Sequence, residues 1–468
     1  MGRLTTQQIT GAGRSIQRRD YGYRADGHLV GLTDQLSGTK TFDVDTAGRV
    51  TAVRAADWSE RYAYDAAGNQ TDASWPAAHP GQEAVGPRTY TGTTITRAGN
   101  VRYEHDTLGR ITLRQKTRLS RKPDTWRYEW DSEDRMRSVT TPDGVVWRYL
   151  YDALGRRTAK QRLTADNQSV GEQTTFVWDG IALCEQSTQA KQVPNFAVLT
   201  WDHQGLLPMT QTESIIAEGD PGTQIDQRFF AIITDLIGSP SEIIDEQGTI
   251  AWRTRTSLWG ATAWTSSATS YTPLRFPGQY YDPESGLHYN LHRYYDPEIS
   301  RYLSSDPLGI VPSPNASTYV ENPQAWADPL GLSPCPGPQA KRQQIEGQEQ
   351  GARWTNDLSH VTGSTAQSRN RALAAILKED FPHLNFTHTP QYSPFVGHAV
   401  ASHGQGTQIG PSPFASRSEL RTSLIHEELH HRWWSRGEFQ SHHPRDGSGT
   451  SEKFYSTVDR YLRMRGWN

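Results

Sequence analysis

An aspartate–glycine pattern recurs at intervals of about 20 residues through the first third of the chain. In each copy an aromatic or similar residue precedes an aspartate, and two residues usually separate that aspartate from a glycine. The copies occupy residues 23–27, 44–49, 64–69, 105–110, 130–135 and 151–156. Aspartate and glycine at fixed offsets favour a tight turn, and the alternating residues after each copy favour strands. The pattern therefore predicts an array of β-hairpins, each of which buries one face against its neighbours.

Composition agrees with many short strands joined by turns. The 468 residues include 15 Trp, 20 Tyr, 40 Gly and 27 Pro, so large buried side chains alternate with turn formers. Two cysteines, Cys184 and Cys335, imply no disulfide framework and exclude a four-thiolate zinc site. The net charge of -3 makes the whole chain no obvious binder of nucleic acid or membrane surfaces. No transmembrane run and no apolar signal core are found, so we expect a protein made in the cytoplasm.

The repeats resemble the tyrosine–aspartate (YD) repeats of Rhs (rearrangement hotspot) proteins, which wind into a hollow β-cocoon. Segments 234–240 and 244–248 continue the series. Segments 275–287, 289–290, 293–297 and 301–307 resemble the Rhs core-associated region, with Ser300 where glycine is usual. The resemblance implies a mainly β protein, a YD-repeat β-hairpin cocoon or shell that encloses a small α+β C-terminal toxin domain. An unrelated β-solenoid or propeller is the alternative.

The resemblance also divides the chain. Residues 1–270 are expected to form the shell, 271–332 the core-associated self-cleavage segment, 333–352 a linker and 353–468 the toxin domain. The Pro- and Gly-rich start of the linker supports this division. Because Met1 already lies within the repeat series, we expect further shell sequence upstream.

Residues 323–332 match the terminal motif after which Rhs proteins cut themselves. Four Asp-Pro pairs, at Asp282, Asp296, Asp306 and Asp328, are turn formers that need only a structural role. A catalytic role requires two carboxylates that share a proton, one as the acid and one to activate water. Asp306 and Asp328 match motif aspartates and are assigned as that pair. The resemblance implies cleavage after Leu332, between Leu332 and Ser333.

The tail contains a His-Glu-x-x-His pattern at His426, Glu427 and His430. A capping box at 416–419 and an apolar stripe through Leu420 and Leu424 predict a helix here. Residues four apart share a helix face, so both imidazoles can bind one Zn²⁺ ion, while Glu427 takes a proton from the attacking water. Helical histidines on the surface are the alternative.

A zinc hydrolase needs a third protein ligand. A second predicted helix, residues 451–462, offers Glu452, and His442 or His443 are alternative third ligands. The arrangement resembles gluzincin metallopeptidases and metallopeptidase-type polymorphic toxin domains. We expect His431 at the surface or as a support for the ligands.

Other functions stay open from the sequence. The tail's histidines also suit a His-metal nuclease, although 15 Lys and Arg against 12 Asp and Glu after Leu332 make a nucleic-acid partner unlikely. An ADP-ribosyltransferase or a binding module are further alternatives. The resemblance implies a cognate immunity protein, a secretion-system spike or adaptor, a target-cell protein substrate, and signal-peptide-free delivery into competing bacteria by a type VI or related system.

Overall fold

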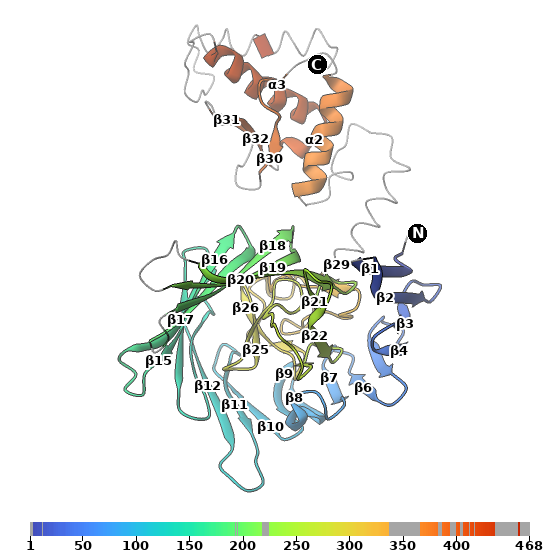
Figure 1. Cartoon of the computed structure of the whole chain (residues 1–468), viewed down its shortest axis with the longest axis vertical. Coiled ribbons are helices and arrows are strands. Elements are labelled where there is room, and N and C mark those ends of the chain that lie inside the picture. The colour runs from blue at the N-terminus through green and yellow to red at the C-terminus, as the bar shows by residue number, and fades with distance from the viewer. Residues whose placement is uncertain are drawn as a thin grey trace. The chain divides into compact units, whose positions relative to one another are not determined.

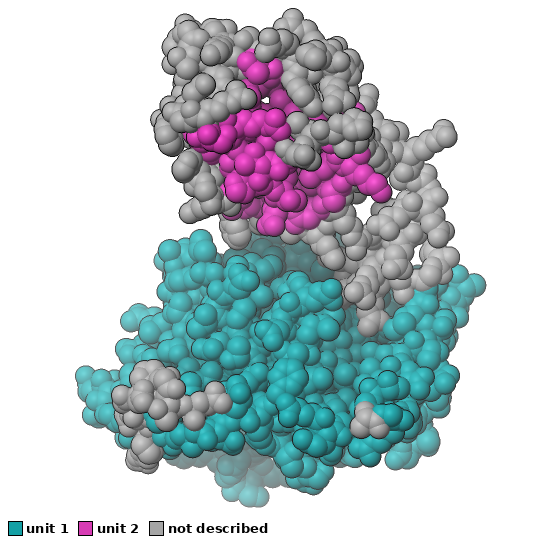
Figure 2. Space-filling view, turned by 45° about the horizontal axis from the view of Figure 1, so that its top comes forward, with its two compact units in different colours: residues 1–346 teal, residues 347–468 magenta. Residues whose placement is uncertain are grey.

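The computed structural model describes residues 3–11, 13–191, 193, 195–217, 224–336, 366–381, 386–393, 399–402, 406–410, 412–415, 417–435 and 457–458. The chain forms two compact units, residues 1–346 and residues 347–468 (Figure 2). Strands dominate the first unit, and the second unit combines helices with short strands.

In the described part of the first unit, 23 strands form one antiparallel sheet, and each strand pairs with the next strand in the chain (Figure 1). The first twelve are β1 (Thr6–Gly11), β2 (Arg14–Tyr23), β3 (Leu29–Asp34), β4 (Gly38–Val44), β5 (Val50–Arg54), β6 (Ser59–Tyr64), β7 (Gln70–Ser74), β8 (Gly86–Thr91), β9 (Thr94–Ala98), β10 (Val101–His105), β11 (Ile111–Lys116) and β12 (Asp124–Trp130). They continue as β13 (Met136–Thr140), β14 (Val146–Tyr151), β15 (Arg157–Leu163), β16 (Val170–Asp179), β17 (Ala182–Ala190), β18 (Asn195–Gln204), β19 (Leu207–Ala217), β20 (Gln224–Thr234), β21 (Pro240–Asp245), β22 (Ile250–Thr256) and β23 (Thr262–Trp264). A short 3-10 helix, η1 (Gln82–Ala84), precedes β8.

The repeated aspartates build the turns of this meander. Asp45 Oδ1 accepts the N–H groups of Ala47 and Arg49, each at 2.9 Å, and Gly48 takes a φ of 86°. The turns that begin at Asp65, Asp106, Asp131 and Asp152 also pair the aspartate N–H with the carbonyl four residues on. A local side-chain acceptor and a residue with positive φ are what such a turn requires, which explains the spacing in the sequence.

In three repeats the aromatic residue before the aspartate links neighbouring repeats. Tyr64 Oη donates to the Val50 carbonyl at 3.0 Å, Trp130 Nε1 donates to the Ile111 carbonyl at 2.9 Å, and Tyr151 Oη donates to the Met136 carbonyl at 2.7 Å. Each ring therefore packs on the sheet while its polar atom is satisfied by an earlier strand.

The core-associated segment forms a second, four-stranded antiparallel sheet. Its strands are β24 (Tyr280–Asp282), β25 (Leu287–Asn290), β26 (Arg293–Asp296) and β27 (Arg301–Tyr302). Tyr289 and Tyr295 share one hydrophobic core with Tyr62 and Tyr149 of the meander. Ser300 takes a left-handed φ of 60°, so it adopts the conformation that glycine would take at the turn.

Buried ion pairs fasten this segment to the meander. Both terminal nitrogens of Arg157 donate to the Asp282 carboxylate, at 2.6 and 2.9 Å, and both residues are fully buried. Arg114 similarly pairs with Asp296 at 3.2 Å. Removal of one partner from such a pair costs about 3–5 kcal/mol, so these contacts hold the segment in a defined position.

The second unit packs two helices and a small sheet around its own core. Its elements are α2 (Ala366–Asp380), β30 (Gln391–Tyr392), β31 (Ala399–Ser402), β32 (Gly406–Ile409), the 3-10 helix η2 (Ser412–Ala415) and α3 (Arg417–Trp434). Strand β32 lies between β30, which is parallel to it, and β31, which is antiparallel. Leu373 and Ile376 of α2 pack with Leu420 and Leu424 of α3. Among the described residues, the helices are too short or too polar to span a bilayer.

The predicted fold class is confirmed: the protein is mainly β, with a YD-type hairpin shell and a smaller α+β unit. The helices predicted at residues 368–379 and from residue 416 are present as α2 and α3. Most of the helix predicted at 451–462 lies outside the described residues. Enclosure of the second unit by the first, and the boundaries 1–270, 271–332, 333–352 and 353–468, stay predictions.

Candidate functional site

Asp328 directly contacts the predicted cleavage site. Its Oδ1 accepts the N–H groups of Leu332 at 2.9 Å and Ser333 at 3.1 Å. Its Oδ2 accepts hydrogen bonds from Tyr302 Oη at 2.8 Å and Arg293 Nη2 at 3.1 Å. The Asp328 side chain is fully buried and takes bonds from both residues that flank the predicted scissile bond.

Asp306 lies beside Asp328 on the same guanidinium. Arg293 Nη2 contacts Asp306 Oδ2 at 2.7 Å as well as Asp328 Oδ2 at 3.1 Å. Burial raises the pKa of the Asp306 carboxyl above its usual value, and the nearby Asp328 charge adds to the rise. The Leu308 N–H and the Arg293 guanidinium act in the opposite direction on that pKa. The structure thus brings together the two aspartates that the sequence paired.

Main-chain contacts hold the strand on both sides of the Leu332–Ser333 bond. Arg293 Nε donates to the Gly331 carbonyl at 2.6 Å. Past the bond, β29 (Cys335–Pro336) pairs with β28 (Trp326–Ala327). A side chain at Gly331 would lie 2.6 Å from the Asn290 carbonyl, so the fit around this turn requires glycine.

The sequence alone did not single out Arg293 and Tyr302. Arg293 also lies over the Tyr302 ring, 3.6 Å from its centroid, and both side chains are buried. Asn290 Nδ2 donates to Tyr302 Oη at 2.7 Å, which leaves the phenol hydrogen for Asp328. In the sequence, Arg293 and Tyr302 are only two of several charged or polar residues in the segments that form β25–β27. All residues of these strands are buried in the structure, so residue type did not set these two apart.

In the second unit, α3 places the two histidines of the His-Glu-x-x-His pattern on one face. His426 Nε2 and His430 Nε2 are 3.2 Å apart. His430 also stacks on Trp434, with ring centroids 5.6 Å apart. The helical spacing of four residues therefore points the two ring nitrogens at the same place.

Glu427 and His431 face the small sheet. Glu427 Oε2 accepts the Ala401 N–H of β31 at 2.6 Å, and burial raises the pKa of its carboxyl to about 7 although that N–H opposes the rise. His431 Nε2 lies 2.9 Å from Thr407 Oγ1 of β32. With 4% of its surface exposed, His431 is buried, so of its two predicted positions the surface one is wrong, and a supporting role beside the ligands stays a prediction. A helix face covered by a sheet buries polar residues along with apolar ones.

The histidine pair fits a zinc ion. Two nitrogens bound tetrahedrally at 2.0–2.1 Å lie about 3.3 Å apart, close to the distance found here. The same distance suits an N–H···N hydrogen bond between neutral imidazoles, so metal analysis has to separate the two arrangements. Glu452, His442 and His443, the candidate third ligands, lie outside the described residues. Within the described ranges, no group of three His, Cys, Asp or Glu side chains is arranged to hold a metal.

Comparison with known families matches each unit separately. Residues 40–310 match the family model described as Teneurin YD-shell, and residues 357–467 match the model described as Metallopeptidase toxin 5. The match to the YD-shell model, together with the hairpin meander and its aspartate turns, identifies the first unit as a YD-repeat shell. The chain belongs to the teneurin YD-shell family, and the resemblance to Rhs/YD-repeat polymorphic toxins that the sequence predicted is confirmed.

Three curated toxins illustrate the relationship. Double-stranded DNA deaminase toxin A of Burkholderia cenocepacia (strain H111) is 32% identical over 343 residues, which cover 70% of this chain and 23% of that protein. Probable deoxyribonuclease RhsA of Dickeya dadantii (strain 3937) is 30% identical over 358 residues, which cover 70% of this chain and 23% of that protein. Toxin protein Tse5 of Pseudomonas aeruginosa (strain PAO1) is 31% identical over 378 residues, with coverages of 71% and 28%. The chain spans about a quarter of the length of these relatives.

Proposed function

We propose that this chain is the processing and effector part of an Rhs toxin. Its first unit cuts the bond between Leu332 and Ser333, and its second unit is a zinc-dependent peptidase. The observation that carries the peptidase assignment is the pair of Nε2 atoms of His426 and His430, 3.2 Å apart on a helix that also carries Glu427. The match of residues 357–467 to a metallopeptidase toxin family supports it.

Self-cleavage is assigned to the two aspartates. Asp328 accepts four hydrogen bonds, which suits a carboxylate because a carboxylate has acceptor capacity on both oxygens. Asp306, whose raised pKa favours the protonated form, holds the proton of the pair. Water adds to the Leu332 carbonyl carbon and gives a proton to Asp328. The carbon–nitrogen bond then breaks, and the Ser333 nitrogen leaves as an amine with the proton that Asp306 supplies. Asp328 positions both amides for this step.

The test of self-cleavage is the Asp328→Asn variant of the full chain. Loss of a general acid–base group typically slows a reaction by about 10²–10⁴-fold, so we expect one uncleaved band on a denaturing gel. Asp166→Asn, which changes an exposed turn aspartate, is the control and should still give two fragments. Two fragments from Asp328→Asn as well would reject the aspartyl mechanism.

The metal site uses residues of α3 and a third ligand. His426 and His430 would hold the zinc ion through Nε2, with Glu452, His442 or His443 as the third ligand. When bound, zinc supplies a Lewis acid that favours attack of water on a peptide carbonyl. Glu427, adjacent to His426 in the chain, accepts the proton of the attacking water. Its bond to the Ala401 N–H fixes the carboxylate against β31.

The test of the peptidase compares three versions of the full chain in bacterial cells: unchanged, His426→Ala and His28→Ala. We expect one zinc per chain by elemental analysis and new protein fragments from the unchanged chain and the His28→Ala control. His426→Ala should lose both. Zinc retained at full stoichiometry in His426→Ala would place the metal elsewhere.

A His-metal nuclease is the second candidate, because two relatives are named as a DNA deaminase and a deoxyribonuclease. The same cells distinguish it: DNA breaks without new protein fragments would replace the peptidase assignment. No described feature favours an ADP-ribosyltransferase.

Delivery and partners are proposed from the family. We expect the toxin to leave the producing cell with a type VI or related spike or adaptor and to act on a protein of the target cell. A cognate immunity protein would protect the producer.

A further inference from the structure

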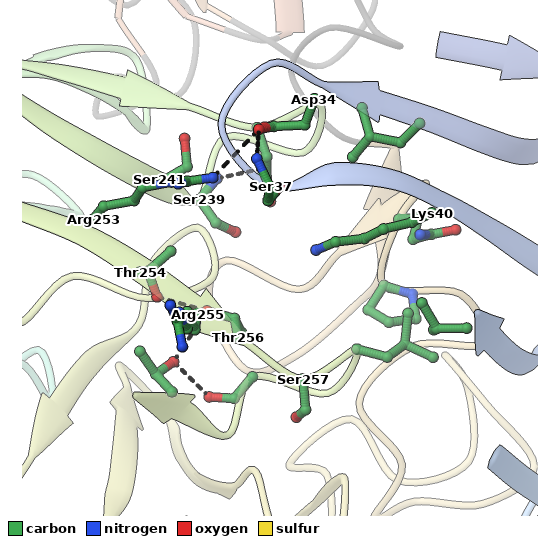
Figure 3. A pocket seen from close by; sticks show the side chains of 18 of the residues that line it. Asp34, Ser37, Lys40, Ser239, Ser241, Arg253, Thr254, Arg255, Thr256 and Ser257 are labelled. Carbon is green, nitrogen blue, oxygen red and sulfur yellow. Dashed lines mark hydrogen bonds and ion pairs between the residues drawn. The ribbon is translucent and has the colours of Figure 1, made fainter. Parts of the chain in front are cut away.

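A cavity of about 540 Å³ lies within the first unit, and neither Asp306 nor Asp328 is among the residues that line it (Figure 3). Strands β2–β6 line one side of it, and β21, β22 and the turn after β22 line the other. These two groups of strands are about 200 residues apart in the chain. The volume is within the range of small-molecule sites, about 300–1,000 Å³.

Charges on one wall of the cavity neutralise each other. Arg19 contacts Asp34 at 3.0 Å and also pairs with Glu242, and Arg253 contacts the same two carboxylates at 3.3 and 3.5 Å. Figure 3 shows the Arg253–Asp34 contact at the edge of the cavity. Two arginines and two acids thus form a closed network with no charge left over for a ligand.

Lys40 differs from these residues. It occupies an inward position of β4, two residues before the buried Phe42, where a strand normally carries an apolar side chain. Its amine points into the cavity (Figure 3) and lies 5.2 Å from the centre of the Trp58 ring. Within the described ranges it has no hydrogen-bond or ion-pair partner. Burial lowers the pKa of this amine, although the Glu60 and Asp34 carboxylates act to raise it.

The cavity lining also contains buried polar atoms that lack a partner among the described residues. They are His79 Nδ1, Ser239 Oγ, Trp252 Nε1, Arg275 Nε and Gln324 Oε1. Three of the five belong to hydrogen donors, namely Ser239, Trp252 and Arg275. These atoms expose almost no surface themselves, so an occupant of the cavity reaches the Lys40 amine rather than these atoms.

We propose that this cavity binds a small organic monocarboxylate, with the carboxylate on the Lys40 amine and an apolar body against Trp58 and Phe42. The Lys40 amine can hold the charge of a carboxylate, and the Trp58 ring beside it can contact the apolar body of the same molecule. The apolar side chains Leu29, Leu236, Leu258 and Phe276 supply the rest of the surface for that body. The inference is independent of the proposed cleavage and peptidase activities.

The test is titration calorimetry of the full chain with indole-3-acetate, indole-3-acetamide and phenyl phosphate. We expect indole-3-acetate to bind at one site per chain and the neutral amide to bind at least tenfold more weakly. Lys40→Met, which removes the charge and keeps the length, should weaken indole-3-acetate at least tenfold, and Lys122→Met at an exposed lysine should not.

Three results would overturn the proposal. They are no binding of indole-3-acetate at millimolar concentration, equal affinity for acid and amide, or equal affinity of the unchanged and Lys40→Met chains. Tighter binding of phenyl phosphate would overturn the monocarboxylate class. The comparison of acid with amide uses the unchanged chain, so it tests the need for a carboxylate even where the Lys40→Met variant fails to fold.

Discussion

Asp328 in the first unit and Glu427 in the second are both buried carboxylates at candidate reactive sites, but their surroundings differ. Asp328 accepts four hydrogen bonds, one of them from a guanidinium. Among the described residues, Glu427 accepts one, from the Ala401 N–H, and burial raises its pKa to about 7. At the proposed cleavage site, the positive charge near the carboxylate therefore belongs to Arg293 of the protein itself. The histidine site instead suits a bound metal cation.

Chelation gives the largest expected difference between the two sites. Removal of zinc with 1,10-phenanthroline should reduce peptide hydrolysis by the processed chain at least about 100-fold, because the metal supplies the Lewis acid. Cleavage after Leu332 should be unchanged, since its charges are protein groups. A peptide library analysed by mass spectrometry measures the first, and a denaturing gel of chain synthesised with the chelator present measures the second. Loss of self-cleavage in chelator would remove the distinction between the sites.

The pH dependence of self-cleavage sharpens the role of Asp306. Burial raises its pKa, so the carboxyl keeps its proton to higher pH than an ordinary aspartic acid. Below the raised pKa, titration of Asp306 should not change the cleavage rate. Above that pKa, the rate should fall by up to about tenfold per pH unit as the acid form of Asp306 is lost. Uncleaved chain refolded from urea into buffers between pH 4 and 8 gives the profile. A rate that climbs steadily through this range would assign the proton to another group.

Tyr302→Phe is expected to have the smallest effect of the three. It deletes the phenol bond to Asp328 Oδ2 and leaves the ring under Arg293. A hydrogen bond to a charged group contributes about 1.5–3 kcal/mol, so cleavage should slow by about 10- to 100-fold. The time course in cell-free synthesis measures it.

Tyr64→Phe is the matched control for that variant, because Tyr64 also donates one phenol bond, to the Val50 carbonyl in the shell. It should cleave at the unchanged rate. Equal slowing of both variants would show that the phenol acts only through stability of the shell.

Local chemistry explains what the sequence determined by itself. The aspartate turns are built from bonds within five residues, as between Asp45 and Arg49, so their spacing alone predicts the hairpins. Helix α3 was likewise predictable, because capping and a four-residue spacing decide it locally. The pairing of Asp306 with Asp328 was reached through family resemblance, and the geometry agrees with it.

Contacts between residues that are far apart in the sequence could be seen only in the tertiary structure. Arg293 and Tyr302 meet Asp328 only because the core-associated sheet packs inside the meander, and His431 is buried only because β32 covers that face of α3. The Lys40 cavity forms only because β4 and β22 line the same space. No local propensity encodes such contacts, because the residues that meet lie between 24 positions apart, as Thr407 and His431 do, and about 200 positions apart, as β4 and β22 do.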